Sequence, residues 1–158
     1  GDAMKKSDRI ESFVDSLGSD SGGEGRFYLA YFDCFNRQLY YEAHDVLEHL
    51  WLKVRGGRGE NEQFFKGLIQ VAGAFVHLKK QYLRPDHPKD GRRLRPAVRL
   101  FRLAMANLAP YRPLHLSLDV AALHQFCNTV ADAIVAADYE VNPWTPDDPP
   151  VLSLMEGA

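Results

Sequence analysis

Hydrophobic side chains return along the chain every three to four residues, which is the spacing of helices that bury one face. Runs of this kind are bounded by glycines such as Gly56 and Gly57, by prolines such as Pro85, or by capping residues at 117–119. No run shows the alternation typical of a strand. The pattern therefore predicts an all-α fold, a compact helical bundle of about five helices with short connections. The predicted helices cover residues 27–35, 39–54, 60–83, 92–108 and 120–137.

The N-terminal part of the chain differs from the rest. Residues 18–25 are rich in glycine and serine and predict a flexible linker. Residues 5–17 have weak helical spacing, so we expect 1–25 to form a flexible N-terminal arm. Residues 1–3 precede Met4, and we interpret them as a cloning remnant.

The C-terminal part is rich in proline. Four prolines fall within residues 142–150, which predicts an irregular tail, and Trp144 and Leu152 are the side chains that we expect to hold it against the helices. Residues 26–158 are thus expected to form a single all-helical domain with this tail at its end.

Composition places the chain among ordinary globular proteins. It has 158 residues, of which 46% are hydrophobic and 25% charged, and this suits one domain with a real core. A net charge of −2 gives no global electrostatic case for binding nucleic acid or a membrane, and no apolar run is long enough to span a bilayer. Cys34 and Cys127 are expected to be free and reduced in the cytoplasm, with Cys34 in the core rather than acting as a nucleophile.

A narrow polar strip marks the second predicted helix. With His44 set at zero on a helical wheel, Glu48 and Trp51 lie at about 40° and −20°, at the border of the apolar face. Asp45 and His49 fall on the side that we expect to face solvent. His44 and Glu48 are one turn apart, so they can bind one metal ion or hydrogen-bond to each other.

The third predicted helix is apolar nearly all round, apart from one strip. Lys66, Gln70, Gly73 and His77 lie within about 60° of one another around the axis. A buried polar group without a partner costs about 1–3 kcal/mol, so this strip indicates a structural network or a ligand cavity. Lys66 is expected at its mouth, reaching solvent.

A short loop joins these two helices, so they should be antiparallel neighbours with facing strips. We expect His44 near the level of Gln70 and His77 about two turns beyond. If a divalent transition metal binds, His44 and Glu48 are the expected ligands with His77 as the third. The candidate ligand-binding set is His44, Glu48, Trp51, Lys66, Gln70 and His77.

The same residues carry a resemblance to a known family. The run from Tyr41 to Trp51 contains H-x-x-x-E-x-x-W, and a second block follows at residues 64–79 with its glutamine and histidine. Both resemble the DUF309 family over about residues 27–110. The resemblance implies a compact helical fold of the TTHA0068-like kind and no established activity.

A row of arginines follows the fourth predicted helix. Arg92, Arg95, Arg99 and Arg102 lie opposite its apolar face, and a solvated helix surface is the favoured interpretation. No aromatic residue interleaves with them, which argues against nucleic acid.

Three hypotheses stay open at the level of sequence. The first is a metal or small-ligand site, with or without an enzymatic role. The second is a non-catalytic interaction module whose His, Glu and Gln side chains form a structural network. The third is a nucleic-acid-associated protein that acts through the arginine row. The sequence specifies neither a reaction nor an oligomeric state.

Overall fold

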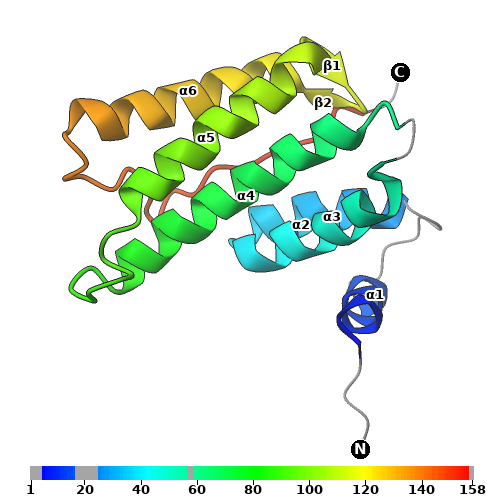
Figure 1. The fold of residues 1–158 in the computed structure, drawn as a ribbon, viewed down its shortest axis with the longest axis horizontal. Helices are drawn as coiled ribbons and strands as arrows, with labels where there is room; N and C mark the ends of the chain where they lie inside the picture. The colour runs from blue at the N-terminus through cyan, green and yellow to red at the C-terminus, as the bar shows by residue number, and fades with distance from the viewer. Residues whose placement is uncertain (1–4, 17–24, 57–58, 157–158) are drawn as a thin grey trace, which may run out of the picture.

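A computed structural model describes residues 5–16, 25–56 and 59–156. This part of the chain forms a helical bundle with one small sheet, as the hydrophobic spacing predicts (Figure 1). The five predicted helices are confirmed, each within two residues at either end. The helices are α1 (Lys6–Ser16), α2 (Gly25–Asn36), α3 (Tyr40–Val54), α4 (Glu62–Leu83), α5 (Leu94–Leu108) and α6 (Val120–Ala136).

Helix α4 lies at the centre of the bundle. It packs against α3 on one side and α5 on the other, while α2 covers α3 and α6 covers α5 (Figure 1). Burial from two sides explains why α4 is apolar nearly all round. Its side chains Phe64, Leu68, Phe75 and Leu78 are all at most 2% exposed.

Close backbone approach fixes α5 against α4. A Cβ atom added to Gly67 would lie 2.7 Å from Cγ of Leu108, nearer than real side-chain contacts allow. The Phe75 ring of α4 meets Phe101 of α5 edge-on, with centroids 5.4 Å apart. Glycine at position 67 thus allows α5 to pack directly onto the backbone of α4.

A two-stranded antiparallel sheet precedes α6 and was not predicted. Strand β1 (Leu114–His115) pairs with β2 (Leu118–Asp119) after a short 3-10 helix, η1 (Ala109–Tyr111). Strands of two residues are too short to show an alternating pattern. The Asp119 side chain then accepts a hydrogen bond of 2.9 Å from the amide of Ala122, as expected of a residue that caps α6.

The chain after α6 runs back across the bundle without regular helix or strand up to residue 156. Trp144 is 4% exposed, and its indole Nε1 donates a 2.9 Å hydrogen bond to the hydroxyl of Tyr40. The amide of Leu152 donates a 2.8 Å bond to the side-chain oxygen of Asn36. These contacts attach the tail to α2 and α3.

Helix α1 lies within the predicted N-terminal arm and contacts α3 and α2. The predicted linker lies outside the described residues, apart from Gly25, which begins α2. Within the described ranges, none of the helices has the length and apolar character needed to cross a bilayer.

Candidate functional site

The polar strips of α3 and α4 run side by side. Lys66 Nζ lies 5.9 Å from the Trp51 ring centroid, and a Cβ on Gly73 would lie 3.9 Å from Cδ2 of His44. His44 is therefore level with Gly73, between Gln70 and His77 in the α4 strip, rather than level with Gln70. His77 lies about one turn beyond that level instead of two.

His44 stands between two carboxylates of its own helix. Its Nδ1 lies 3.1 Å from Oδ1 of Asp45, and its Nε2 lies 3.9 Å from Oε2 of Glu48. Lys6 of α1 joins them, with Nζ 3.4 Å from Glu48 and 4.0 Å from Asp45. We call these four residues the His44 cluster; its α3 side chains keep between 19% and 31% of their surface exposed, so a ligand can reach them.

Asp45 and His49 do not face open solvent, contrary to expectation. His49 is 8% exposed, with its ring centroid 4.9 Å from that of Phe27 on α2. Its Nε2 lies 3.4 Å from Oε1 of Glu11 on α1. The helical wheel treats α3 alone, whereas α1 and α2 pack against the side of α3 that carries these two residues.

Trp51 and Lys66 form one end of the paired strips. Lys66 is exposed and its ammonium group lies over the Trp51 ring, while the Arg55 guanidinium lies 5.4 Å from the same ring. The arrangement is a cation–π contact between a partly buried indole and two surface cations. It agrees with the expectation that Lys66 reaches solvent.

Gln70 and His77 are directed to α5 and its preceding loop rather than to His44. Oε1 of Gln70 accepts a 2.8 Å hydrogen bond from Nδ2 of Asn107. Nδ1 of His77 accepts from Nη1 of Arg93 at 3.1 Å. The six predicted residues therefore do not surround one site. They form separate contacts at different levels of the α3–α4 pair and on the α5 side of α4.

His77 belongs to a charged network that the sequence reasoning missed. Arg93 donates two bonds to Oδ1 of Asp90, at 2.6 and 2.9 Å, and Arg84 donates to the other oxygen at 3.1 Å. Burial, together with the positive charges of Arg93 and Lys80, lowers the pKa of His77 to about 4. His77 is therefore neutral at pH 7 and acts as a hydrogen-bond acceptor.

The predicted metal set is not brought together as one group. Across residues 5–16, 25–56 and 59–156, no three His, Cys, Asp or Glu side chains are grouped so that they could hold a metal ion. The hydrogen bond from Arg93 occupies Nδ1 of His77. A metal role for these three residues stays a prediction.

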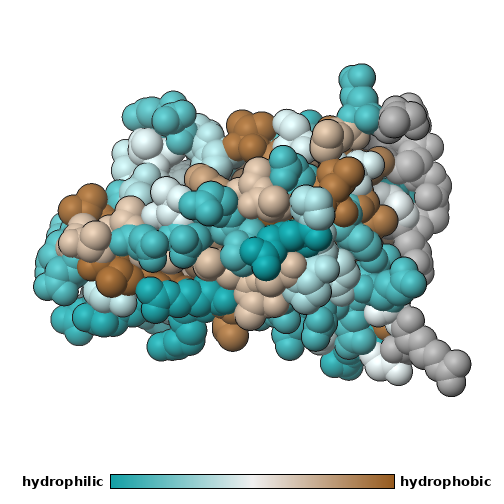
Figure 2. All heavy atoms as spheres, turned by 90° about the horizontal axis from the view of Figure 1, so that it is seen from above, coloured by the Kyte–Doolittle hydropathy of each residue, from teal (hydrophilic) through white to brown (hydrophobic). Residues whose placement is uncertain are grey.

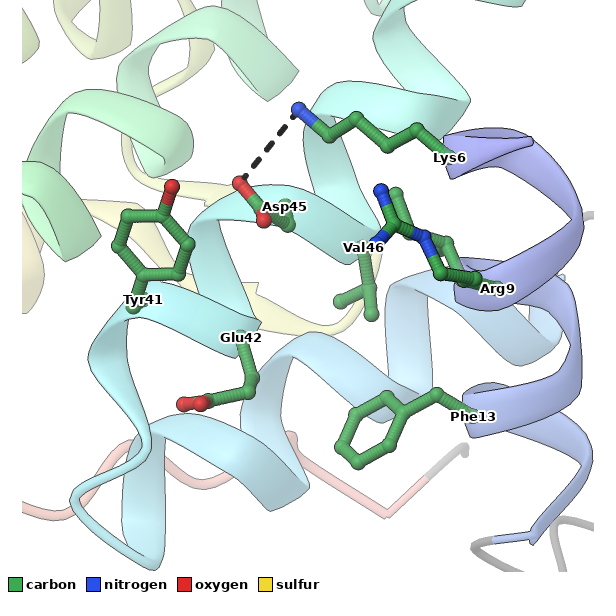
Figure 3. Close-up of a pocket in the computed structure, with 8 residues that line it drawn as sticks. Lys6, Arg9, Phe13, Tyr41, Glu42, Asp45 and Val46 are labelled. Carbon is green, nitrogen blue, oxygen red and sulfur yellow. Dashed lines mark ion pairs between the residues drawn. The ribbon is translucent and has the colours of Figure 1, made fainter. Parts of the chain in front are cut away.

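A pocket of about 420 Å³ opens beside the His44 cluster, between α1 and α3 (Figure 3). Lys6 and Asp45 belong to both the pocket and the cluster, and their ion pair spans one edge. The sequence does not predict this pocket, because residues 1–25 are expected to form a flexible arm without packed contacts. The residues that line it are Lys6, Arg9, Ile10, Phe13, Tyr41, Glu42, Asp45 and Val46.

The two cysteines offer no nucleophile. Both are free and buried, and burial raises the pKa of each thiol to about 12. At neutral pH both remain protonated thiols, so Cys34 serves the core, as expected.

Comparisons with known proteins identify one part of the chain. No curated protein and no solved structure matches it. Residues 28–85, which include α3, α4 and all six predicted site residues, match the model of the family described as a domain of unknown function, DUF309. This confirms the family resemblance over a shorter stretch than the expected 27–110. Residues 28–85 of this chain therefore constitute a DUF309 domain.

Proposed function

We propose that the protein binds a small molecule that carries both a positive and a negative charge, in the pocket between α1 and α3. One observation carries this proposal: the pocket presents a cation and an anion that have no ion-pair partner among the described residues. Among the described residues, neither Arg9 of α1 nor Glu42 of α3 has an ion-pair partner, and both line the pocket (Figure 3). A zwitterionic ligand would satisfy the two charges at once.

The shape and lining of the pocket support a small organic ligand. A volume of about 420 Å³ falls within the range usual for ligand sites. Ile10 and Val46 contribute apolar surface between the charged groups. Apolar surroundings lower the local dielectric constant and strengthen the attraction between ligand and pocket charges.

His44 supplies a proton-accepting group at the edge of this site. If Asp45 accepts the Nδ1 proton, Nε2 of His44 is left as an acceptor, as in histidines that act as general bases. The Tyr41 ring, which lines the pocket, lies parallel to the His44 ring with centroids 6.4 Å apart. A ligand in the pocket would thus contact Tyr41 and Asp45, the two lining residues that lie against the His44 ring.

The test is an NMR titration of the full chain with three matched sets of probes. L-amino acids supply zwitterions, the corresponding amines lack the carboxylate, and the corresponding carboxylates lack the amine. We expect saturable shifts of the amides of residues 41–46 with at least one zwitterion. Loss of either ligand charge, or the change Glu42→Gln or Arg9→Gln, should weaken binding about tenfold, the loss of one charge-assisted contact.

Glu140→Gln removes an exposed carboxylate that does not line this pocket and serves as the matched control. Its binding should equal that of the wild type. Single-charge probes that bind as well as the zwitterion would contradict the proposal, as would an absence of shifts with every amino acid tested.

A second candidate is the non-catalytic interaction module, for which the His77 network is the supporting observation. Arg93, which is bonded to Asp90, also donates to His77 and so joins the start of α5 to α4. Burial and the charge of Arg93 keep His77 neutral. This candidate predicts that His77→Ala destabilises the fold by about 1–3 kcal/mol while His44→Ala does not. Equal stability of both variants in urea would argue against it.

The metal hypothesis is tested separately. Protein purified without a metal-affinity column is analysed for its elements before and after soaking with zinc, iron and manganese salts. Binding through His44 and Glu48 predicts close to one equivalent, which is lost in His44→Ala. A content that stays far below one equivalent after soaking would exclude the metal version.

A further inference from the structure

A second site lies on the other side of α4, along the exposed face of α5. A groove of about 440 Å³ is lined there by Arg95, Val98, Arg99, Arg102, Leu103 and Tyr139. We call it the α5 groove. Five of these residues belong to α5, and Tyr139 comes from the chain just after α6. The face that is uppermost in Figure 1, where α5 and α6 lie, is mostly hydrophilic with small, separate hydrophobic patches (Figure 2).

The groove carries positive charge that nothing in the described chain neutralises. All three of its arginines are exposed, and none has an ion-pair partner among the described residues. No carboxylate lines the groove. Asp138 and Glu140 line an adjoining hollow near Arg92 instead, at the end of the groove where Arg95 lies. The end of the groove that carries Arg99 and Arg102 is farthest from these carboxylates, so it is the part best suited to hold an anionic group.

The spacing of the arginines suits a linear polyanion. Arg95, Arg99 and Arg102 follow one another by about one helical turn, so they extend over about 10 Å of the α5 axis. A single phosphate would contact one or two of them. Successive phosphates of a nucleic acid strand would engage all three.

An aromatic ring completes the groove. The Arg95 guanidinium lies 3.9 Å from the Tyr139 ring centroid, and Leu103, 46% exposed, adds apolar surface. Stacking on such surfaces is how bases of single strands are held without sequence preference. The one aromatic residue between the arginines in sequence, Phe101, is buried in the core, and Tyr139 joins the groove only through the packing of α6 on α5.

Backbone geometry holds Tyr139 in place. Asp138 and Tyr139 adopt φ angles of 53° and 60°, in the left-handed region that non-glycine residues rarely occupy. Their amides donate 2.9 Å hydrogen bonds to the carbonyls of Val135 and Ile134. The end of α6 thus fixes the turn that directs the tyrosine to Arg95.

We propose that the α5 groove binds single-stranded nucleic acid, with phosphates along Arg95, Arg99 and Arg102 and a base against Tyr139 and Leu103. The net charge of −2 does not oppose this, because charges beyond about 8 Å are largely screened at physiological salt. The proposal is independent of the ligand pocket, since α4 separates α3 from α5.

The test is fluorescence anisotropy of a labelled oligothymidylate with the full chain. Contacts to about three phosphates predict a salt slope of log affinity of about −2. Arg99→Glu/Arg102→Glu should weaken binding at least tenfold and flatten the slope to about −0.7. Tyr139→Leu should weaken binding at least fivefold and leave the slope unchanged, because it removes stacking only.

Arg37→Glu/Lys89→Glu makes the same change of net charge at two exposed positions outside the groove and should leave the affinity within about threefold. Arg99→Gln/Arg102→Gln repeats the test with a milder change, and circular dichroism checks the fold of every variant. Three results would each overturn the proposal: no binding at low salt, equal loss in the control variant, or tighter binding of a duplex or free nucleotide than of the single strand.

Discussion

His77 gives the fold a dependence on pH whose sign and size follow from its surroundings. The ordinary pKa of histidine is 6.5, whereas burial and the neighbouring Arg93 lower the pKa of His77 to about 4. On acidification, His77 is therefore protonated near pH 6.5 in the unfolded chain but only near pH 4 in the folded chain. The stability that neutral His77 contributes is complete above pH 6.5 and is lost as the pH falls towards 4.

The magnitude follows from the two pKa values. Full titration between them corresponds to about 3 kcal/mol of unfolding free energy, of which about 2 kcal/mol falls between pH 7.5 and pH 5. The ring is partly exposed, so solvent screening reduces the expected loss to about 1 kcal/mol.

The assay is urea unfolding at these two pH values for the wild type and for His77→Gln. Glutamine keeps an acceptor for Arg93 and removes the titrating ring, so the variant should lose about 1 kcal/mol less than the wild type on acidification. An equal pH dependence in the wild type and in His77→Gln would refute the reasoning.

Three further predictions concern the packing and the helix cap. Gly67→Ala should lower the unfolding free energy by about 1–3 kcal/mol in urea, because its Cβ would meet Leu108; an unchanged midpoint would contradict this. Trp144→Ala should cost about 3–5 kcal/mol, and Trp144→Phe should cost less because it loses mainly the bond to Tyr40; equal losses would count against the tail as a packed element. Asp119→Ala should cost about 1 kcal/mol and Asp119→Asn almost nothing, and the reverse order would exclude the cap.

The helices could be predicted because each buries a long face, so the hydrophobic spacing repeats over several turns. The contacts around them could not. His49 is buried because α2 brings Phe27 and α1 brings Glu11 to the side of α3 that its own spacing marks as polar. A helical wheel treats one helix alone, whereas burial depends on every element packed against it.

The candidate site was predicted in part for the same reason. His44 and Glu48 lie on one helix, so their proximity follows from local geometry. The partner of His77 is Arg93, beyond the end of α4, and its position depends on how the intervening loop folds back. Such a contact leaves no periodic signal in the sequence.

The central position of α4 has a consequence for where this protein can be divided. The stretch that the family model recognises ends two residues after α4, so it excludes α5. In a fragment that contains only this stretch, the side of α4 that packs against α5 would be exposed to water. Gly67 and Phe75 lie on that side, where they contact Leu108 and Phe101. We therefore expect the segment shared by sequence similarity to need α5 for stable folding, because α5 covers this flank of α4.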